Sequence, residues 1–424
     1  MNNEDKVYHD LKDQNIKDLE EQYNKYIYPK PCEDIKKDWI KNNRFYHGDP
    51  NYHWHKLWPE KPYSNKKLYI LVAGCGTHQA AILAKCNPNH NFIGIDISKK
   101  SIAHQKKLIK KHGIKNLKLH CNDFRLLKFK KKFDYIISTG VIHHLDDPGS
   151  ALNYFKQNLA DDGVILLMVY GDKKAYAGNQ LKKLFRKINL NQNEDSIKGV
   201  KNIISKLNKD HPAKNFDGHK DTTYSANTID LFLHKKETFF SIKELISLLS
   251  KNGLIIKNFL DGRIKSFAKY FTDNKSMLYK MKNLPLEEQW ELAQILNWND
   301  RKIDVVCCKK ENYKTSIAYN PVNLGEIYTC MFQDTFWTVD KQNISILDKG
   351  NNGKFNFQFP PDYKIKWLQI LRGQQKVGDI LKNLKEPEKT DLRNAITFMI
   401  ESCLLDISFH PIANYQNYYN KKGK

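Results

Sequence analysis

The residues with the clearest chemical meaning are two glycines and an aspartate within the first strongly apolar part of the chain. Residues 68–76 read Leu-Tyr-Ile-Leu-Val-Ala-Gly-Cys-Gly, and Asp96 ends the next apolar run, residues 91–96. This order predicts a buried strand, a glycine turn, a helix and a second strand that ends in an acid. In a parallel sheet the carboxyl ends of neighbouring strands meet at one edge, so the acid would lie beside the turn. This edge is where such sheets hold adenosine-containing cofactors, so the pattern predicts a cofactor site.

The residues after the glycine pair decide between classes of cofactor. The dinucleotide fingerprint needs a third glycine so that a helix can approach a pyrophosphate, but His78 and Gln79 follow here. Asp96 lies 96 − 76 = 20 residues beyond Gly76, the interval at which a carboxylate meets ribose hydroxyls. Asp123 ends a third expected strand, where it could meet an adenine amino group. The pattern therefore favours an adenosine cofactor without phosphates.

The elements that must position these residues follow a regular β/α rhythm. We expect strands at residues 68–73, 91–95, 117–120, 133–138, 163–169, 254–260 and 303–308. Ser98 and Gly113 are the expected cap and stop of one intervening helix, and Ser241-Ile-Lys-Glu244 with Gly253 are those of another. Alternation of this kind predicts an α/β fold, a Rossmann-like doubly wound sheet with helical insertions.

Changes in amino-acid composition and in the pattern of expected elements divide the chain into three parts. Residues 1–64 end in dense prolines and aromatics, typical of a lid or entrance, and residues 65–310 form the expected core. Within that core, 172–240 and 261–302 are expected insertions that cover the substrate. Residues 311–424 are expected to form a small α+β accessory module. Its expected elements are a hairpin from 336–339 and 344–347, followed by helices at 365–371, 377–384 and 391–405.

Composition limits the classes of function. The formal net charge is +23, which could indicate a nucleic-acid partner. However, the excess is mostly lysine, spread along an asparagine-rich chain, and arginine, the usual base reader, is scarce. The eight cysteines form no C-x-x-C pair, so neither a zinc ribbon nor a redox pair is indicated. No apolar run is long enough for a membrane span and the start has no apolar signal region, so we expect a cytoplasmic protein without membrane contact.

Residues 65–170 resemble class I S-adenosylmethionine (SAM)-dependent methyltransferases. The segments that carry the resemblance are the glycine motif Val-Ala-Gly-Cys-Gly-Thr at 72–77, Gly-Ile-Asp at 94–96, Asn-Asp-Phe at 122–124 and the loop at 138–148. Two further segments, Gln-Tyr-x-x-Tyr-x-Tyr-Pro at 22–29 and Gly-Cys-Gly-Thr-x-Gln-Ala-Ala at 74–81, are similar to a bacterial type-12-like group. His78 departs from the third glycine of many methyltransferases.

The resemblance implies which residues touch SAM. These are Ala73, Gly74, Cys75, Gly76, Gln79, Asp96, Ile97, Asn122, Asp123, Phe124, Ser138, Thr139 and Gly140. Asp96 would hold the ribose, the 122–124 segment the adenine, and residues 138–140 would pass the methionine part. Tyr26 and Tyr28 could close over the sulfonium by cation–π contact, or simply pack.

The loop after the fourth strand carries the candidate catalytic residues. His143 and His144 could act as general base for an acceptor that arrives protonated, or they could anchor the loop. His53 and His55 form an H-x-H pair without a third ligand, so no metal is expected. The loop lacks the Asp/Asn-Pro-Pro-aromatic and Pro-Cys motifs of DNA methylation, which argues against a nucleic-acid substrate.

These observations predict methyl transfer from SAM to a small molecule or a protein side chain, with positioning as the main source of catalysis. Two alternatives stay open. The chain could be an RNA or protein methyltransferase that uses its basic surface, or a non-catalytic SAM-binding regulatory module. The acceptor, the atom methylated and whether the protein forms a homo-oligomer are not indicated by the sequence.

Overall fold

The computed structural model describes most of the chain, with the gaps between the following ranges. The described residues are 14–40, 47–59, 61, 64, 66–215, 224–260, 274–296, 302–313, 324–331, 335–339, 343–348, 353–358, 369–370, 373, 375–401 and 405–408. The helix expected at 365–371, apart from residues 369–370, and parts of the expected insertions therefore lie outside them.

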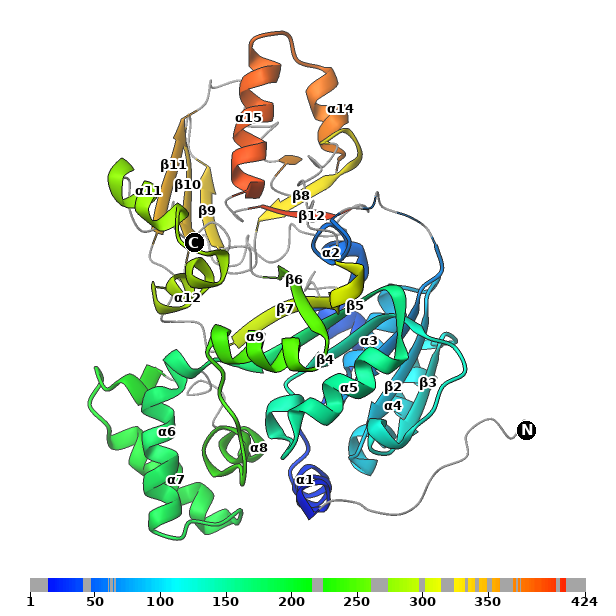
Figure 1. Ribbon diagram of the computed structural model, residues 1–424, viewed down its shortest axis with the longest axis vertical. Helices are drawn as coiled ribbons and strands as arrows, with labels where there is room; N and C mark the ends of the chain where they lie inside the picture. Colours follow the sequence, from blue (N-terminus) through cyan, green and yellow to red (C-terminus); the bar gives the residue numbers. More distant parts are fainter. Residues whose placement is uncertain are drawn as a thin grey trace. The chain divides into compact units, whose positions relative to one another are not determined.

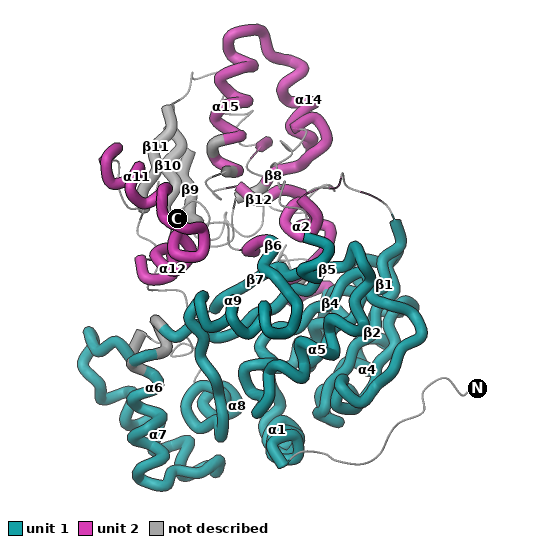
Figure 2. The backbone as a smooth tube through the Cα atoms, viewed as in Figure 1, with its two compact units in different colours: residues 1–35, 66–257, 300–313 teal, residues 36–65, 258–299, 314–424 magenta. Residues whose placement is uncertain are grey.

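The chain divides into two compact units, each built from separated stretches of sequence (Figure 2). Unit 1 comprises residues 1–35, 66–257 and 300–313. Unit 2 comprises residues 36–65, 258–299 and 314–424. The N-terminal region is thus shared between them, because residues 1–35 belong to unit 1 and residues 36–65 to unit 2.

Unit 1 is built on a seven-stranded sheet of order β3-β2-β1-β4-β5-β7-β6 (Figure 1). Its strands are β1 (Tyr69–Ala73), β2 (Asn91–Asp96), β3 (Leu117–Cys121), β4 (Phe133–Thr139), β5 (Leu159–Tyr170), β6 (Leu254–Phe259) and β7 (Lys302–Lys309). The pairs β1–β2, β2–β3, β1–β4 and β4–β5 are parallel, whereas β7 runs antiparallel to β5. The expected Rossmann-like fold is confirmed, and its strand order reverses at β1, where ligands bind in such sheets.

Four of the described helices flank the sheet, namely α3 (Gln79–Cys86), α4 (Lys99–His112), α5 (Pro148–Asn158) and α9 (Ile242–Lys251). The two whose caps the sequence predicted, α4 and α9, begin at those caps. Ser98 accepts a bond from Ser101 at the start of α4, and Gly113 ends it with φ 61°. Ser241 and Glu244 form the expected capping box of α9. Strands β1, β2 and β4 are buried along nearly their whole length, as expected of strands covered on both faces.

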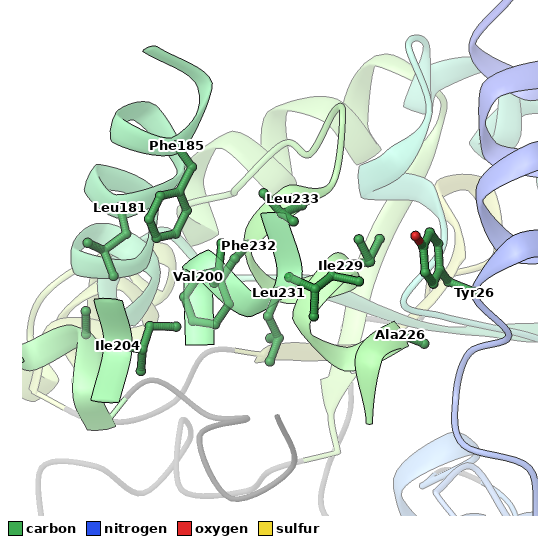
Figure 3. Close-up of a cluster of buried hydrophobic side chains, with 12 residues drawn as sticks. Tyr26, Leu181, Phe185, Val200, Ile204, Ala226, Ile229, Leu231, Phe232 and Leu233 are labelled. Atoms are coloured by element: carbon green, nitrogen blue, oxygen red, sulfur yellow. The ribbon is translucent and has the colours of Figure 1, made fainter. Parts of the chain in front are cut away.

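A helical layer is inserted between β5 and α9. It contains α6 (Asp172–Lys187), α7 (Glu194–Lys206), α8 (Ser225–Thr228) and the π-helical segment η6 (Ile229–Leu233). Figure 3 shows its buried side chains, which α6, α7, α8 and η6 contribute together with Tyr26 from the N-terminal segment. Helix α1 (Gln14–Lys25) belongs to the same unit and packs against α4. The layer therefore fixes the position of η6, which carries polar residues of the candidate site.

Unit 2 contains two small antiparallel sheets with helices. Strands β9 (Thr335–Val339), β10 (Asn343–Asp348) and β11 (Gly353–Gln358) form one sheet, and β8 (Tyr328–Met331) with β12 (Leu405–Ser408) forms the other. Its helices are α2 (Pro50–Leu57), α11 (Lys275–Lys282), α12 (Leu286–Leu296), α14 (Val377–Lys382) and α15 (Glu388–Glu401). The expected hairpin is formed by β9 and β10, and β11 adds a strand that the sequence did not predict.

None of the helices in the described ranges is long and apolar enough to cross a membrane.

Gly94 of β2 lies in close contact with α3 and β3, and this contact leads to a prediction. A Cβ at Gly94 would stand 2.9 Å from Cβ of Ala80 and 2.8 Å from Leu119. Because Ala80 cannot rotate away, we expect Gly94→Ala to lower the free energy of unfolding by about 1–3 kcal/mol, measured by urea denaturation. Gly199→Ala is the control: Gly199 lies within α7 with nothing within 4 Å of its added Cβ. That variant should gain up to about 1 kcal/mol, and an equal loss in both variants would contradict the packing argument.

Candidate cofactor and acceptor site

The glycine turn after β1 is held against the end of β2. The amides of Gly74 and Cys75 both donate to the carbonyl of Ile95, at 2.8 and 3.0 Å. Gly74 and Gly76 have φ values of 72° and 55°, a conformation that favours glycine. A Cβ at Gly74 would stand 2.3 Å from the side chain of Val141. Both glycines are therefore required by the backbone path and by its close contacts.

Asp96 is joined to this turn by its carboxylate. One oxygen accepts from the amide of Gly76 at 2.7 Å and the other from the amide of Ser98 at 2.8 Å. Burial raises the pKa of Asp96 above its ordinary range, although the two amide bonds oppose the shift. The carboxylate is thus oriented beside the glycine turn, where the 20-residue interval predicted it.

Gln105 of α4 is a site residue that the sequence analysis missed. Its amide nitrogen lies 3.1 Å from the carbonyl of Cys75 and 2.7 Å from that of Gly76, and its oxygen accepts from the amide of Ala81. It is fully buried, so these bonds satisfy its amide and fix the turn. The available signal was a glutamine on the apolar face of an amphipathic helix.

Residues 77–79 connect the turn to its surroundings. The Thr77 hydroxyl donates to the carbonyl of Pro29 at 3.0 Å and contacts the buried ring of His78 at 2.7 Å. Gln79 accepts a bond from the Thr139 hydroxyl at 3.1 Å. His78 therefore takes part in a local polar network where many methyltransferases have glycine.

Asp123 follows β3, and its carboxylate binds Arg125. Its carboxylate accepts from the backbone amide and the guanidinium of Arg125, at 2.8 to 3.2 Å. Asn122 lies beside it and is half-buried, and the backbone amide of Asn122 donates to the carbonyl of Asp96. Phe124 is buried and stacks on Phe155. The structure thus brings the 122–124 segment to the Asp96 loop.

The remaining predicted cofactor residues lie along the same edge. Ala73 ends β1 and is fully buried, and the Ile97 carbonyl contacts the thiol of Cys121. Ser138 is buried near the end of β4, and Gly140, with φ 74°, donates to the carbonyl of Met168. Burial raises the pKa of the Cys75 thiol well above its ordinary value, so this cysteine stays protonated.

The N-terminal segment packs on the glycine turn and on the inserted layer. A Cβ at Gly76 would lie 3.0 Å from the ring of Pro29 and 3.7 Å from the carbonyl of Tyr28. Tyr26 is buried in the layer shown in Figure 3, and its hydroxyl donates to the carbonyl of Gln192 at 3.0 Å. In this arrangement Tyr26 serves as a packing residue, whereas Tyr28 borders the turn.

His143 and His144 follow β4 and are both buried. The ring of His143 lies 4.0 Å from that of Tyr170 and 4.2 Å from that of His144. The His143 carbonyl accepts from the amide of Thr238. His144 turns instead toward the inserted layer, where its ring stacks on His234 at 4.0 Å.

His144, Asp230 and His234 form the group of three potential metal ligands found in the described part of the chain. Their ligand atoms lie within 4.8 Å of one another, and all three are buried. However, Nδ1 of His234 accepts from the amide of Lys236 at 3.3 Å, so the neutral ring carries its hydrogen on Nε2. A nitrogen that bears hydrogen cannot ligate, so this arrangement does not fit a cation. His53 and His55 of α2 belong to no such group among the described residues.

The arrangement fits the SAM that the sequence predicted. Two glycines with left-handed backbone leave no Cβ at positions 74 and 76, and an oriented carboxylate stands beside the turn. Neither feature provides the cluster of helix N-terminal amides that a pyrophosphate requires, because α3 opens on the side chains of His78 and Gln79.

Comparison with known proteins agrees with this geometry. Residues 64–225 match the family model described as a methyltransferase domain. An uncharacterized protein of Synechococcus sp. is 24% identical over 246 residues, which are 54% of this chain and 57% of that protein. A malonyl-[acyl-carrier protein] O-methyltransferase of Bacillus cereus is 25% identical over 50% of this chain and 77% of its own length. The chain thus spans little more than half the length of the first of these relatives.

A solved structure is similar to most of the chain. PKMT2 from Rickettsia typhi, in complex with AdoHcy, superimposes with a TM-score of 0.64 at 18% identity, covering 85% of this chain and 75% of that one. At this identity the likeness concerns the fold. Residues 64–225 therefore match a methyltransferase domain, and the solved structure supports the Rossmann-like fold of the chain.

Proposed function

We propose that the protein transfers the methyl group of SAM to a small molecule or a protein side chain. The observation that carries the proposal is the Asp96 carboxylate, oriented by the amides of Gly76 and Ser98 at the edge where the strand order reverses. SAM supplies a methyl group already activated by its sulfonium. The chain's own residues then bind and orient the two substrates and exclude water, which is the main source of rate in a displacement of this kind.

The geometry supports a division of labour among the cofactor residues. Asp96 accepts from the ribose hydroxyls, and Ala73 to Gly76 with Gln79 line the methionine side together with Ser138 to Gly140. Ile97 and Phe124 flank the adenine. Asn122 is better suited than Asp123 to meet the adenine edge, because the Asp123 carboxylate is engaged by Arg125. Of the two lid candidates, Tyr28 is the better placed, since it borders the turn.

The basic surface supports a second candidate, an RNA or protein methyltransferase. Its evidence is the net charge of +23 alone. A third candidate, a SAM-binding module without catalysis, is disfavoured by the buried histidines and carboxylate beside the cofactor loop, because simple binding of SAM would not require them.

We predict that Asp96→Asn weakens SAM binding by about ten- to a hundredfold. The substitution removes the charge that strengthens two hydrogen bonds to the ribose, worth about 1.5–3 kcal/mol, and leaves one oxygen for only one of the amides of Gly76 and Ser98. Isothermal titration calorimetry with SAM measures the effect. Asp161→Asn is the matched control, because Asp161 is an exposed carboxylate whose partner is Lys309. No binding of SAM by the unaltered protein would refute the proposed function.

The raised pKa of Asp96 gives the binding a pH dependence of known sign. Ribose hydroxyls bind the ionised carboxylate, whereas burial favours its protonated form. Affinity for SAM should therefore be constant near neutral pH and fall as pH drops through the raised pKa, above the ordinary 3.8. Calorimetry across this range should show proton release on binding in the same window. Asp96→Asn should abolish this release, and its persistence in that variant would assign the titration to another group.

Salt dependence separates the second candidate from the first. If the positive charge of the chain does not serve RNA binding, a short single-stranded RNA should bind weakly. The logarithm of its binding constant should then fall only slightly with the logarithm of the salt concentration. Filter binding at several salt concentrations measures the slope. A slope that corresponds to several displaced counterions would favour an RNA substrate instead.

A further inference from the structure

Five polar side chains, four of them buried and Tyr23 half-buried, meet beside the cofactor loop, and the sequence analysis assigned a role to one of them. They are Tyr23 of α1, His144 after β4, Tyr170 at the end of β5, and Asp230 and His234 of the inserted layer. Asp230 is 1% exposed, His234 2% and His144 3%. We refer to these five residues as the acceptor cluster. Burying a carboxylate and two imidazoles together is costly unless their partners are well placed, so the partners are informative.

Both tyrosines donate to Asp230. The Tyr23 hydroxyl lies 3.3 Å from one carboxylate oxygen, and the Tyr170 hydroxyl lies 3.4 Å from the other. Burial, and then the charge of Asp230, raises the pKa of Tyr23 well above its ordinary value. Tyr23 therefore keeps its proton and acts as a donor, which holds the carboxylate in place.

His234 is fixed as a donor toward the cluster. The amide of Lys236 donates to Nδ1, which leaves the hydrogen on Nε2, 3.4 Å from the Tyr23 hydroxyl. Burial, and then neighbouring His144 and Lys182, lowers the pKa of His234 well below its ordinary value, so the ring remains neutral. With one nitrogen accepting and the other bearing hydrogen, His234 is a positioning residue rather than a base.

His144 has the opposite tautomer. Its Nδ1 faces the carbonyl of Lys236 at 3.5 Å, and a carbonyl can only accept, so the hydrogen lies on Nδ1 and the lone pair on Nε2. The ring is clamped between His234 at 4.0 Å and the edge of Tyr170 at 6.1 Å. Asp230 is close enough to stabilise the imidazolium that forms when Nε2 takes a proton.

The cluster is tied directly to the cofactor loop. Ser98, whose amide holds Asp96, donates its hydroxyl to the carbonyl of Tyr23 at 3.1 Å. The charge of Asp96 also contributes to the raised pKa of Tyr23. Tyr23 thus stands between the residue proposed to hold the ribose and the buried carboxylate.

We propose that His144 and Asp230 form the proton-accepting side of the methyl-acceptor site, which therefore takes a hydroxyl or an amine rather than a carboxylate. This inference rests on the proposed function. The acceptor's lone pair forms a bond to the methyl carbon, the carbon–sulfur bond breaks with its electron pair kept by sulfur, and the acceptor's proton passes to Nε2 of His144. A carboxylate acceptor is already ionised, so it would not need this base, and it would be repelled by Asp230.

The charge of Asp230 can be tested with the cofactor alone. S-adenosylhomocysteine lacks the methyl group of SAM and the positive charge on its sulfur. We expect Asp230→Asn to reduce the preference for SAM over S-adenosylhomocysteine by on the order of tenfold, while the affinity for S-adenosylhomocysteine stays unchanged. Asp134→Asn is the control, since that carboxylate binds the amide of Tyr69 at the opposite end of β4. An unchanged preference in Asp230→Asn would overturn the placement of Asp230. Failure of either ligand to bind the unaltered protein would instead overturn the proposed function.

The class of acceptor is tested with the unaltered protein, so the result does not depend on a variant that folds. Tritiated methyl-labelled SAM is incubated with the protein and a cell extract, and the labelled products are treated with alkali. Methyl groups on hydroxyls or amines survive, whereas methyl esters release volatile methanol. Label that stays bound supports the proposal, and release of most of it as methanol would overturn it. An absence of transferred label would contradict the proposed function as well.

Discussion

The closed glycine turn is the constraint on which the rest of the site depends. The carbonyls of Cys75 and Gly76 in this turn both accept from the side-chain amide of Gln105. The same glutamine accepts from the first turn of α3, so one side chain joins the turn, α3 and α4. Because a buried carbonyl left without a donor costs about 1–3 kcal/mol, this single amide holds the turn in the shape that Asp96 then completes.

The sequence predicted the parts of this site that follow from local order. Gly76 and Asp96 lie next to the ends of adjacent parallel strands, and adjacent parallel strands bring their carboxyl ends together, so spacing alone predicts their meeting. Helix caps such as Ser98 and the Ser241–Glu244 box are also local, and both formed as expected. Gln105 was missed because a glutamine on the apolar face of α4 does not by itself reveal its partners, which are backbone groups and the sulfur of Cys75.

The acceptor cluster could not be predicted for a different reason. Tyr23 and His234 lie 211 residues apart in the chain, and the segment that carries Asp230 is positioned by the packing of α6, α7 and α8 (Figure 3). No periodicity encodes which inserted helix reaches the edge of the sheet. The sequence did identify His144 as a candidate base, but the tautomers that separate it from His234 depend on the backbone of Lys236.

The position of Tyr23 has a consequence for the order of binding. Its carbonyl is held by Ser98, beside the Asp96 carboxylate, and its hydroxyl is held by Asp230. Tyr23 therefore joins the Asp96 loop to Asp230, through its backbone at one end and its side chain at the other. If SAM binds at Asp96 as proposed, this connection links its binding to the position of Asp230 and favours an order in which SAM binds before the acceptor.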